Sequence, residues 1–183
     1  LGNNSTTQSS SPVAVVSNVD LSGKILFSVL AGTNHSVAIC TDGTMFAWGR
    51  NGNGQLGTGS HTQTSVPRKV YSQFALAGKS VLHAAAGDAH TLALCSDGSV
   101  FAWGLNGGRL GNGDMDASAV PVPVVMTGTL AGKTVTDIAA GENHSLALCS
   151  DGSIAAWGIG SYGQLGNGAT SYFETVPRPV SGA

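Results

Sequence analysis

The chain has 183 residues, of which 42% are hydrophobic and 10% are charged, and its formal net charge is −2. This composition indicates a globular chain with a core and excludes a disordered tail or a coiled coil. The eight Lys and Arg residues form no cluster, and no apolar run approaches the roughly 20 residues of a membrane span, so we expect no nucleic-acid partner and no membrane insertion.

Taken in chain order, the sequence consists of one partial and three complete copies of a unit. AGTNHSVAICTDGTMFAWG at 31–49 aligns without gaps with residues 86–104 and 140–158. Residues 1–18 match the last loop and strand of the third copy, at 165–181. The expected boundaries are an outer strand of a preceding unit at 1–20 and complete units at 21–75, 76–129 and 130–183.

Each complete unit is predicted to contain four short strands, here named A to D. In the third unit, HSLALC at 144–149 alternates between two faces, and the Asp-Gly that follows is typical of a tight hairpin. The prolines of the last strand confine it to an edge. The predicted strands are A near 134–139, B at 144–149, C at 153–158 and D at 176–180.

Four antiparallel strands repeated about every 50 residues are typical of the blades of a β-propeller. The predicted fold is therefore all-β, with three full blades and one orphan outer strand. Three blades do not close a ring, so either the chain is a segment of a larger propeller or several chains complete a ring together. We favour the segment.

The pattern A-G-x-x-H-S-x-A-x-C-x-D-G, followed by A-W-G and G-Q-L-G, resembles the regulator of chromosome condensation repeat across nearly the whole chain. The resemblance implies a propeller, typically of seven blades. That fold hosts exchange factors for small GTPases, ubiquitin-ligase modules, a plant ultraviolet-B photoreceptor and secreted inhibitors of β-lactamase, so it does not settle the function. The Gly-Trp-Arg-His-Thr motif of the photoreceptor is missing here.

One histidine and one tryptophan recur at the same place in every unit. Packed sheets lie about 10 Å apart, whereas a zinc ion needs ligands at about 2 Å, so the histidines are expected to bond to backbone or to a neighbouring blade. The tryptophans are expected to be wedges between blades. No catalytic motif is present, and we expect no enzyme activity, metal or cofactor. These structural positions are His35, His90, His144, Trp48, Trp103 and Trp157.

The loops of an up-and-down blade emerge on two rims. The rim with the B–C and D–A loops repeats the same Asp-Gly and L-x-G-K residues, which indicates structural turns. The rim with the A–B and C–D loops differs between copies. A surface fitted to an asymmetric partner would show such differences, and neutral drift in loops would produce them as well. Its candidate partner-binding residues are Arg50, His61, Asp88, Arg109, Asp114, Asp116, Glu142, Tyr162, Tyr172, Phe173 and Glu174.

The expected function is a non-enzymatic scaffold whose variable rim binds a basic or neutral protein, or other copies of the chain. One alternative is a regulator of a small GTPase by guanine-nucleotide exchange, or a secreted proteinaceous enzyme inhibitor. Another is an architectural propeller segment that self-assembles. A secreted or cell-surface location is favoured over a cytoplasmic one, because the repeats are alike and low in charge.

Overall fold

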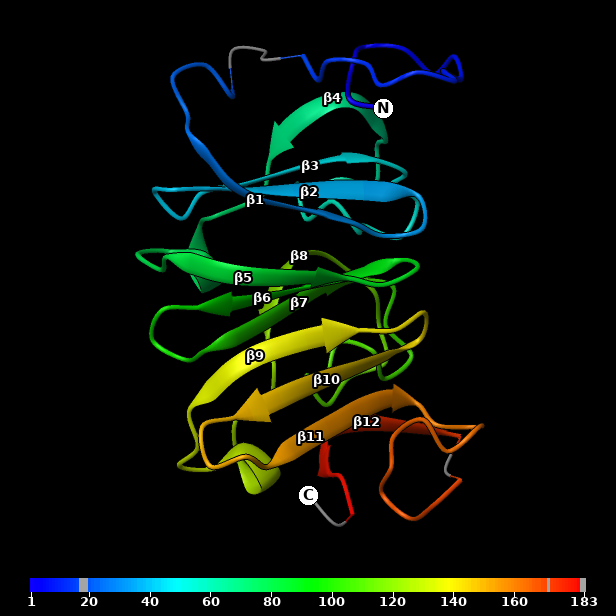
Figure 1. Cartoon of the computed structure of the whole chain (residues 1–183). Helices are drawn as coiled ribbons and strands as arrows, with labels where there is room; N and C mark the ends of the chain where they lie inside the picture. The colour runs from blue at the N-terminus through cyan, green and yellow to red at the C-terminus, as the bar shows by residue number, and fades with distance from the viewer. Residues whose placement is uncertain (17–19, 171, 182–183) are drawn as a thin grey trace.

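The computed structural model describes residues 1–16, 20–170 and 172–181, and it consists of three four-stranded antiparallel sheets stacked in a row (Figure 1). In each sheet every strand pairs with the strand that precedes it in the chain. The predicted all-β fold of four-stranded blades is confirmed.

Blade 1 holds β1 (Leu26–Ala31), β2 (His35–Cys40), β3 (Met45–Gly49) and β4 (Thr64–Lys69). Blade 2 holds β5 (Val81–Ala86), β6 (His90–Cys95), β7 (Val100–Gly104) and β8 (Ser118–Pro123). Blade 3 holds β9 (Val135–Ala140), β10 (His144–Cys149), β11 (Ile154–Ile159) and β12 (Phe173–Pro179).

The hydrophobic core lies between the blades. Side chains alternate along β2, so Val37 and Ile39 face blade 2, where Trp103 belongs to the same buried cluster. A second cluster joins blades 2 and 3 in the same way, with Leu92 on one side and Trp157 on the other. Both indoles also bond to the preceding blade. Trp103 Nε1 donates to the backbone oxygen of Gln55 at 3.0 Å, and Trp157 Nε1 to that of Arg109 at 2.9 Å.

The predicted orphan outer strand at 1–20 is an outer segment without strand geometry: residues 1–16 form no strand, and 17–19 lie outside the described residues. An outer strand pairs only with strand C of its own blade, and residues 1–16 pair with no strand C among the described residues. The segment still follows the course of the later C–D loops. The Asn4 N–H donates to the Ser65 oxygen of β4, as the Gly59 N–H does to Ala119 of β8.

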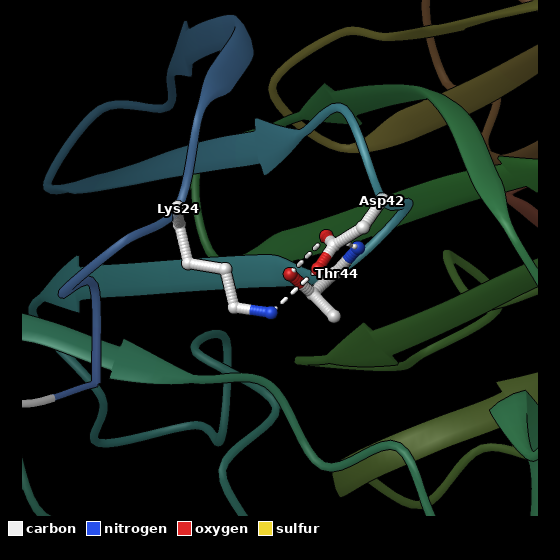
Figure 2. A network of polar contacts seen from close by, with 3 residues as sticks. All are labelled: Lys24, Asp42 and Thr44. Carbon is white, nitrogen blue, oxygen red and sulfur yellow. Dashed lines mark hydrogen bonds and ion pairs between the residues drawn. The ribbon is translucent and has the colours of Figure 1, made fainter.

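The rim with the B–C hairpins carries one ion pair per blade. Lys24 Nζ lies 2.5 Å from an Asp42 carboxylate oxygen, and the Thr44 hydroxyl donates to the other oxygen at 2.6 Å (Figure 2). The lysine and the threonine together hold the pKa of Asp42 below its usual range. The matching pairs are Lys79–Asp97 and Lys133–Asp151. On this rim the repeated acidic and basic side chains therefore neutralise one another.

Two single-turn 3₁₀ helices, at Phe74–Leu76 and Gly128–Leu130, lead from one blade to the next. No helix in the described part of the chain is long and apolar enough to cross a membrane.

Candidate partner-binding rim

The rim opposite the ion pairs consists of two sets of loops joined by backbone hydrogen bonds. The A–B turns are residues 32–34, 87–89 and 141–143, and the C–D loops are residues 50–63, 105–117 and 160–172. In each blade the residue directly after the strand-C glycine donates to the A–B turn. The bonds run from the N–H groups of Arg50, Leu105 and Ile159 to the oxygens of Asn34, Ala89 and Asn143, at 2.8, 2.8 and 2.9 Å.

Buried asparagines organise the C–D loops of blades 1 and 2. Asn51 donates its amide to the backbone oxygens of Ser60 and Thr62, at 2.8 and 3.0 Å, and accepts from the Leu56 N–H. Asn106 bonds the loop of blade 2 in the same way. Neither residue was predicted from the sequence, although an Asn at the third position after the repeat tryptophan recurs in two copies. In blade 3 the position is Gly160.

The three A–B turns line a hollow of about 580 Å³. Thr33, Asp88 and Glu142 lie around it, one from each blade. Asp88 is half-buried and Glu142 is exposed, and neither forms an ion pair with another described residue. The structure thus brings together two of the predicted acidic residues at one hollow, where Glu142 also accepts a hydrogen bond from the Asn143 side chain at 3.1 Å.

Arg109 holds two blades together. Its guanidinium donates to Asn143 Oδ1 through Nε at 3.1 Å and through a terminal nitrogen at 2.6 Å. The other terminal nitrogen donates to the Asn106 oxygen at 2.5 Å. Burial lowers the pKa of Arg109, while the charges of Asp88 and Glu142 act in the opposite direction. The guanidinium of Arg109 is therefore already occupied by contacts within the chain.

The remaining predicted residues lie on the C–D loops or at the start of β12. Tyr162 is 95% exposed, and Tyr172 and Phe173 are exposed rings in an edge-to-face pair with centroids 6.0 Å apart. Phe173 and Glu174 were predicted in the loop but belong to β12, because that strand begins before the predicted residue 176. Glu174 pairs with Arg178 at 2.9 Å. The exposed side chains left at the loops include Arg50, His61, Asp114 and Asp116.

Two of the repeat histidines, His35 and His90, lie between blades. His35 Nε2 is 2.9 Å from the Thr91 hydroxyl, and His90 Nε2 is 3.1 Å from the Ser145 hydroxyl. Burial lowers the pKa of His35 to about 4 and that of His90 to about 3. Among the described residues, no group of three or more His, Cys, Asp or Glu side chains could hold a metal ion.

Two family models match the chain, and both carry the description "Regulator of chromosome condensation (RCC1) repeat". One matches residues 42–94 and 97–148. The other matches residues 28–55, 81–108 and 135–164.

Curated relatives include the ultraviolet-B receptor UVR8 of Arabidopsis thaliana, 36% identical over 149 residues, which are 81% of this chain and 32% of the receptor. Mouse protein RCC2 is 37% identical over 175 residues, covering 88% of this chain and 32% of RCC2. The chain thus spans about a third of the length of these relatives.

Among solved structures, human WBSCR16 superposes with a TM-score of 0.73 at 30% identity, covering 88% of this chain and 41% of that one. Prp20p from Saccharomyces cerevisiae superposes with a TM-score of 0.74 at 22% identity, covering 86% and 39%, a likeness that concerns the fold.

Proposed function

The chain belongs to the regulator of chromosome condensation repeat family, and we propose that it is a non-enzymatic scaffold whose A–B and C–D rim binds a basic segment of a partner protein. The structure of Prp20p is described together with its binding to Gsp1p and histones. At 22% identity that likeness transfers neither partner to this chain. The proposal depends instead on the charges of the rim.

One observation carries the proposal, namely the contrast between the two rims. On the hairpin rim each repeated aspartate is paired with a lysine of its own blade. On the opposite rim four acidic side chains form no ion pair with any described residue: Asp88, Asp114, Asp116 and Glu142. Two of the four, Asp88 and Glu142, line the hollow between the A–B turns. Acidic groups without an ion-pair partner attract groups of the opposite charge and favour a basic partner.

Exposed aromatic side chains supply the apolar contacts that such a partner needs. Tyr162, Tyr172 and Phe173 stand on the C–D loop and β12 of blade 3, and Met115 stands on the loop of blade 2. Aromatic residues are enriched among those that dominate binding energy. A peptide with Lys or Arg residues next to apolar ones fits this combination.

The test is a selection from a random display library of twelve-residue peptides on the immobilised chain, followed by fluorescence anisotropy with the selected peptide. We expect selected peptides rich in Lys, Arg and aromatic residues. The double variant Asp88→Lys, Glu142→Lys should weaken binding about tenfold or more, and added salt should weaken it further, since exposed charges are screened.

Asp137→Lys, which changes an exposed acid of β9 outside the A–B and C–D loops, is the matched control and should bind normally. Selected peptides without cationic residues, or equal binding by the double variant, would contradict the proposal.

A further inference from the structure

The linker between blade 1 and blade 2 carries an exposed aromatic ring on a strained backbone. Phe74 is 84% exposed, and its φ of +58° lies in the left-handed region, which is costly for a residue with a Cβ atom. Gly128 holds the same position in the linker between blades 2 and 3, with a φ of +66°. Strained residues cluster at binding and catalytic sites. The strain and the exposure of Phe74 therefore point to a role for its ring at the surface.

Tyr71 enlarges the aromatic surface at Phe74. The two rings stack with their centroids 6.2 Å apart, and the Tyr71 hydroxyl donates to Gln73 Oε1 at 3.3 Å. The linker between blades 2 and 3 has Val125 at the position of Tyr71 and contains no aromatic residue. The ring pair thus distinguishes the first linker from the second.

A small hollow opens at the same linker, between the two blades. Its volume is about 60 Å³, and its apolar lining residues, each at most 5% exposed, are Met45, Val70, Leu76 and Val81. Ser72 also lines it, at a position where the second linker has Met126, whose side chain packs against the core between blades 2 and 3. The volume is about that of two water molecules, so the hollow admits the end of one side chain.

The free charge beside the hollow is positive. Lys69 lines the hollow, is exposed, and forms no ion pair with another described residue. The other charged lining residues are already paired, Asp42 with Lys24 and Lys79 with Asp97. Blade 2 has Pro123 at the position of Lys69. An unpaired cation beside an apolar hollow attracts a carboxylate group.

We propose that this surface docks a segment of a partner protein in which an apolar side chain stands next to Asp or Glu. The apolar side chain enters the hollow and contacts the Phe74 ring, while the carboxylate pairs with Lys69. The linker surface consists of Lys69, Tyr71, Ser72, Phe74 and Leu76.

The linker surface is separate from the acidic rim. All of its residues belong to β4 of blade 1 or to the linker that follows, and the hollow is completed by the hairpin of blade 1 and by β5 of blade 2. These elements lie on the rim of the ion pairs. The proposal therefore does not depend on any partner that binds the A–B and C–D loops.

The experiment uses the full chain and fluorescent probe peptides with the central sequence Glu-Glu-X-Glu-Glu, in which X is Leu, Ile, Met or Phe. Fluorescence anisotropy measures their binding. At least one of the four should bind, and replacing X by Ser or every Glu by Lys should weaken its binding at least about tenfold, because each change removes one of the two contacts. Equal binding of the Lys peptide, or no binding of any acidic probe up to its solubility limit, would overturn the proposal.

Variants of the linker surface test the ring and the hollow separately. Phe74→Gly should weaken binding at least about tenfold without lowering the free energy of unfolding, since glycine suits this backbone. Ser72→Met should weaken binding by filling the hollow, as Met126 fills the matching space. Urea unfolding of each variant separates lost binding from lost folding. Normal binding by Phe74→Gly would show that the ring makes no contact and would overturn the proposal.

A charge reversal tests the role of Lys69. Lys69→Glu should weaken binding of the acidic probe at least about tenfold and should improve binding of the Lys peptide. Arg178→Glu is the matched control, since Arg178 is an exposed cation on the outer strand of blade 3, and it should bind normally. Equal effects of the two reversals would assign the attraction to the net charge of the chain and would overturn the proposal.

An NMR titration locates the bound peptide. The backbone amide shifts should change mainly at residues 69–77. Changes confined to the A–B and C–D loops would place the peptide on the opposite rim and would overturn the proposal. Sedimentation equilibrium without peptide tests for a second copy as the occupant, and self-association that Phe74→Gly abolishes would overturn the assignment to a partner protein.

Discussion

At the scale of single residues, Phe74 has a backbone conformation that suits glycine. Its φ is +58°, it is 84% exposed, and Gly128 holds the same position before blade 3 with a φ of +66°. The left-handed region costs a residue with a Cβ atom about 1 to 2 kcal/mol. The ring recovers part of this cost through its stacked contact with Tyr71, with centroids 6.2 Å apart.

We therefore expect Phe74→Gly to raise the free energy of unfolding by up to about 1 kcal/mol, the relief of strain being offset by the entropy of glycine in the unfolded chain. Urea unfolding followed by tryptophan fluorescence measures the change. Phe74→Ala is the control, since it removes the contact with Tyr71 and keeps the strain, so it should be less stable than the unaltered chain. A Phe74→Gly variant no more stable than Phe74→Ala would contradict this account.

At single residues, the sequence predicts which positions repeat between blades but not which side chains bond to another part of the chain. The repeat positions of His90 and Trp103 follow from copy-to-copy alignment alone, because the same residue types recur at them in all three units. Arg109 was placed among the partner-binding residues because it differs between copies. The structure shows that it bonds to Asn143 of the next blade. A residue that differs between copies can thus make a contact within the chain and need not bind a partner. The spacing of residues in the sequence does not distinguish these two roles.

At the scale of elements, the C–D loops differ in how they are held. The loops of blades 1 and 2 close around Asn51 and Asn106, both fully buried. The loop of blade 3 has Gly160 at this position, and its bonds there are backbone ones such as that from Gly160 to Tyr172 at 3.2 Å. The sequence predicted the existence of all three loops but not this difference. It also placed the start of β12 three residues late, because 173–175 carry no proline or alternating pattern that would extend the strand.

We expect Asn106→Ala to lower the free energy of unfolding by about 2 kcal/mol, because the carbonyl oxygens and N–H groups that it satisfies would lose buried partners. Hydrogen exchange should show the loss of protection at Gly108 and Leu110, whose N–H groups donate to Asn106 Oδ1. Asn112→Ala is the control on the same loop, at a less buried asparagine, and should cost less. Equal losses for the two variants would contradict a special role of Asn106.

At the scale of the whole molecule, the stack of blades predicts sensitivity to acid. The folded chain holds the pKa of His35 at about 4 and that of His90 at about 3, below the usual value of 6.5, mainly through burial. Between the pKa of each histidine in the folded chain and its usual value of 6.5, the unfolded chain therefore binds protons more readily than the folded chain does. The stability from neutral, buried histidines is fully present above about pH 6.5 and is lost as the pH falls toward the folded values.

Accordingly, the free energy of unfolding should fall by up to about 1.4 kcal/mol per pH unit for each buried histidine below about pH 6. Urea titrations at pH 7.0, 6.0 and 5.0 measure this slope in a range where ordinary carboxylates remain ionised. His90→Gln should make the slope shallower, whereas His61→Gln, at an exposed loop residue, should leave it unchanged. A slope that His90→Gln does not alter would assign the acid sensitivity to other groups.

The order of the strands also has a consequence for how the chain reaches its fold. Within every sheet each strand pairs with its predecessor, so the ladders join residues that are close in sequence. Contacts between blades, such as that between His35 and Thr91, span 56 residues. Local pairings close small loops at low entropic cost and form early. A blade can therefore fold as it leaves the ribosome and serve as the template on which the following one condenses, so that synthesis itself sets the order of assembly.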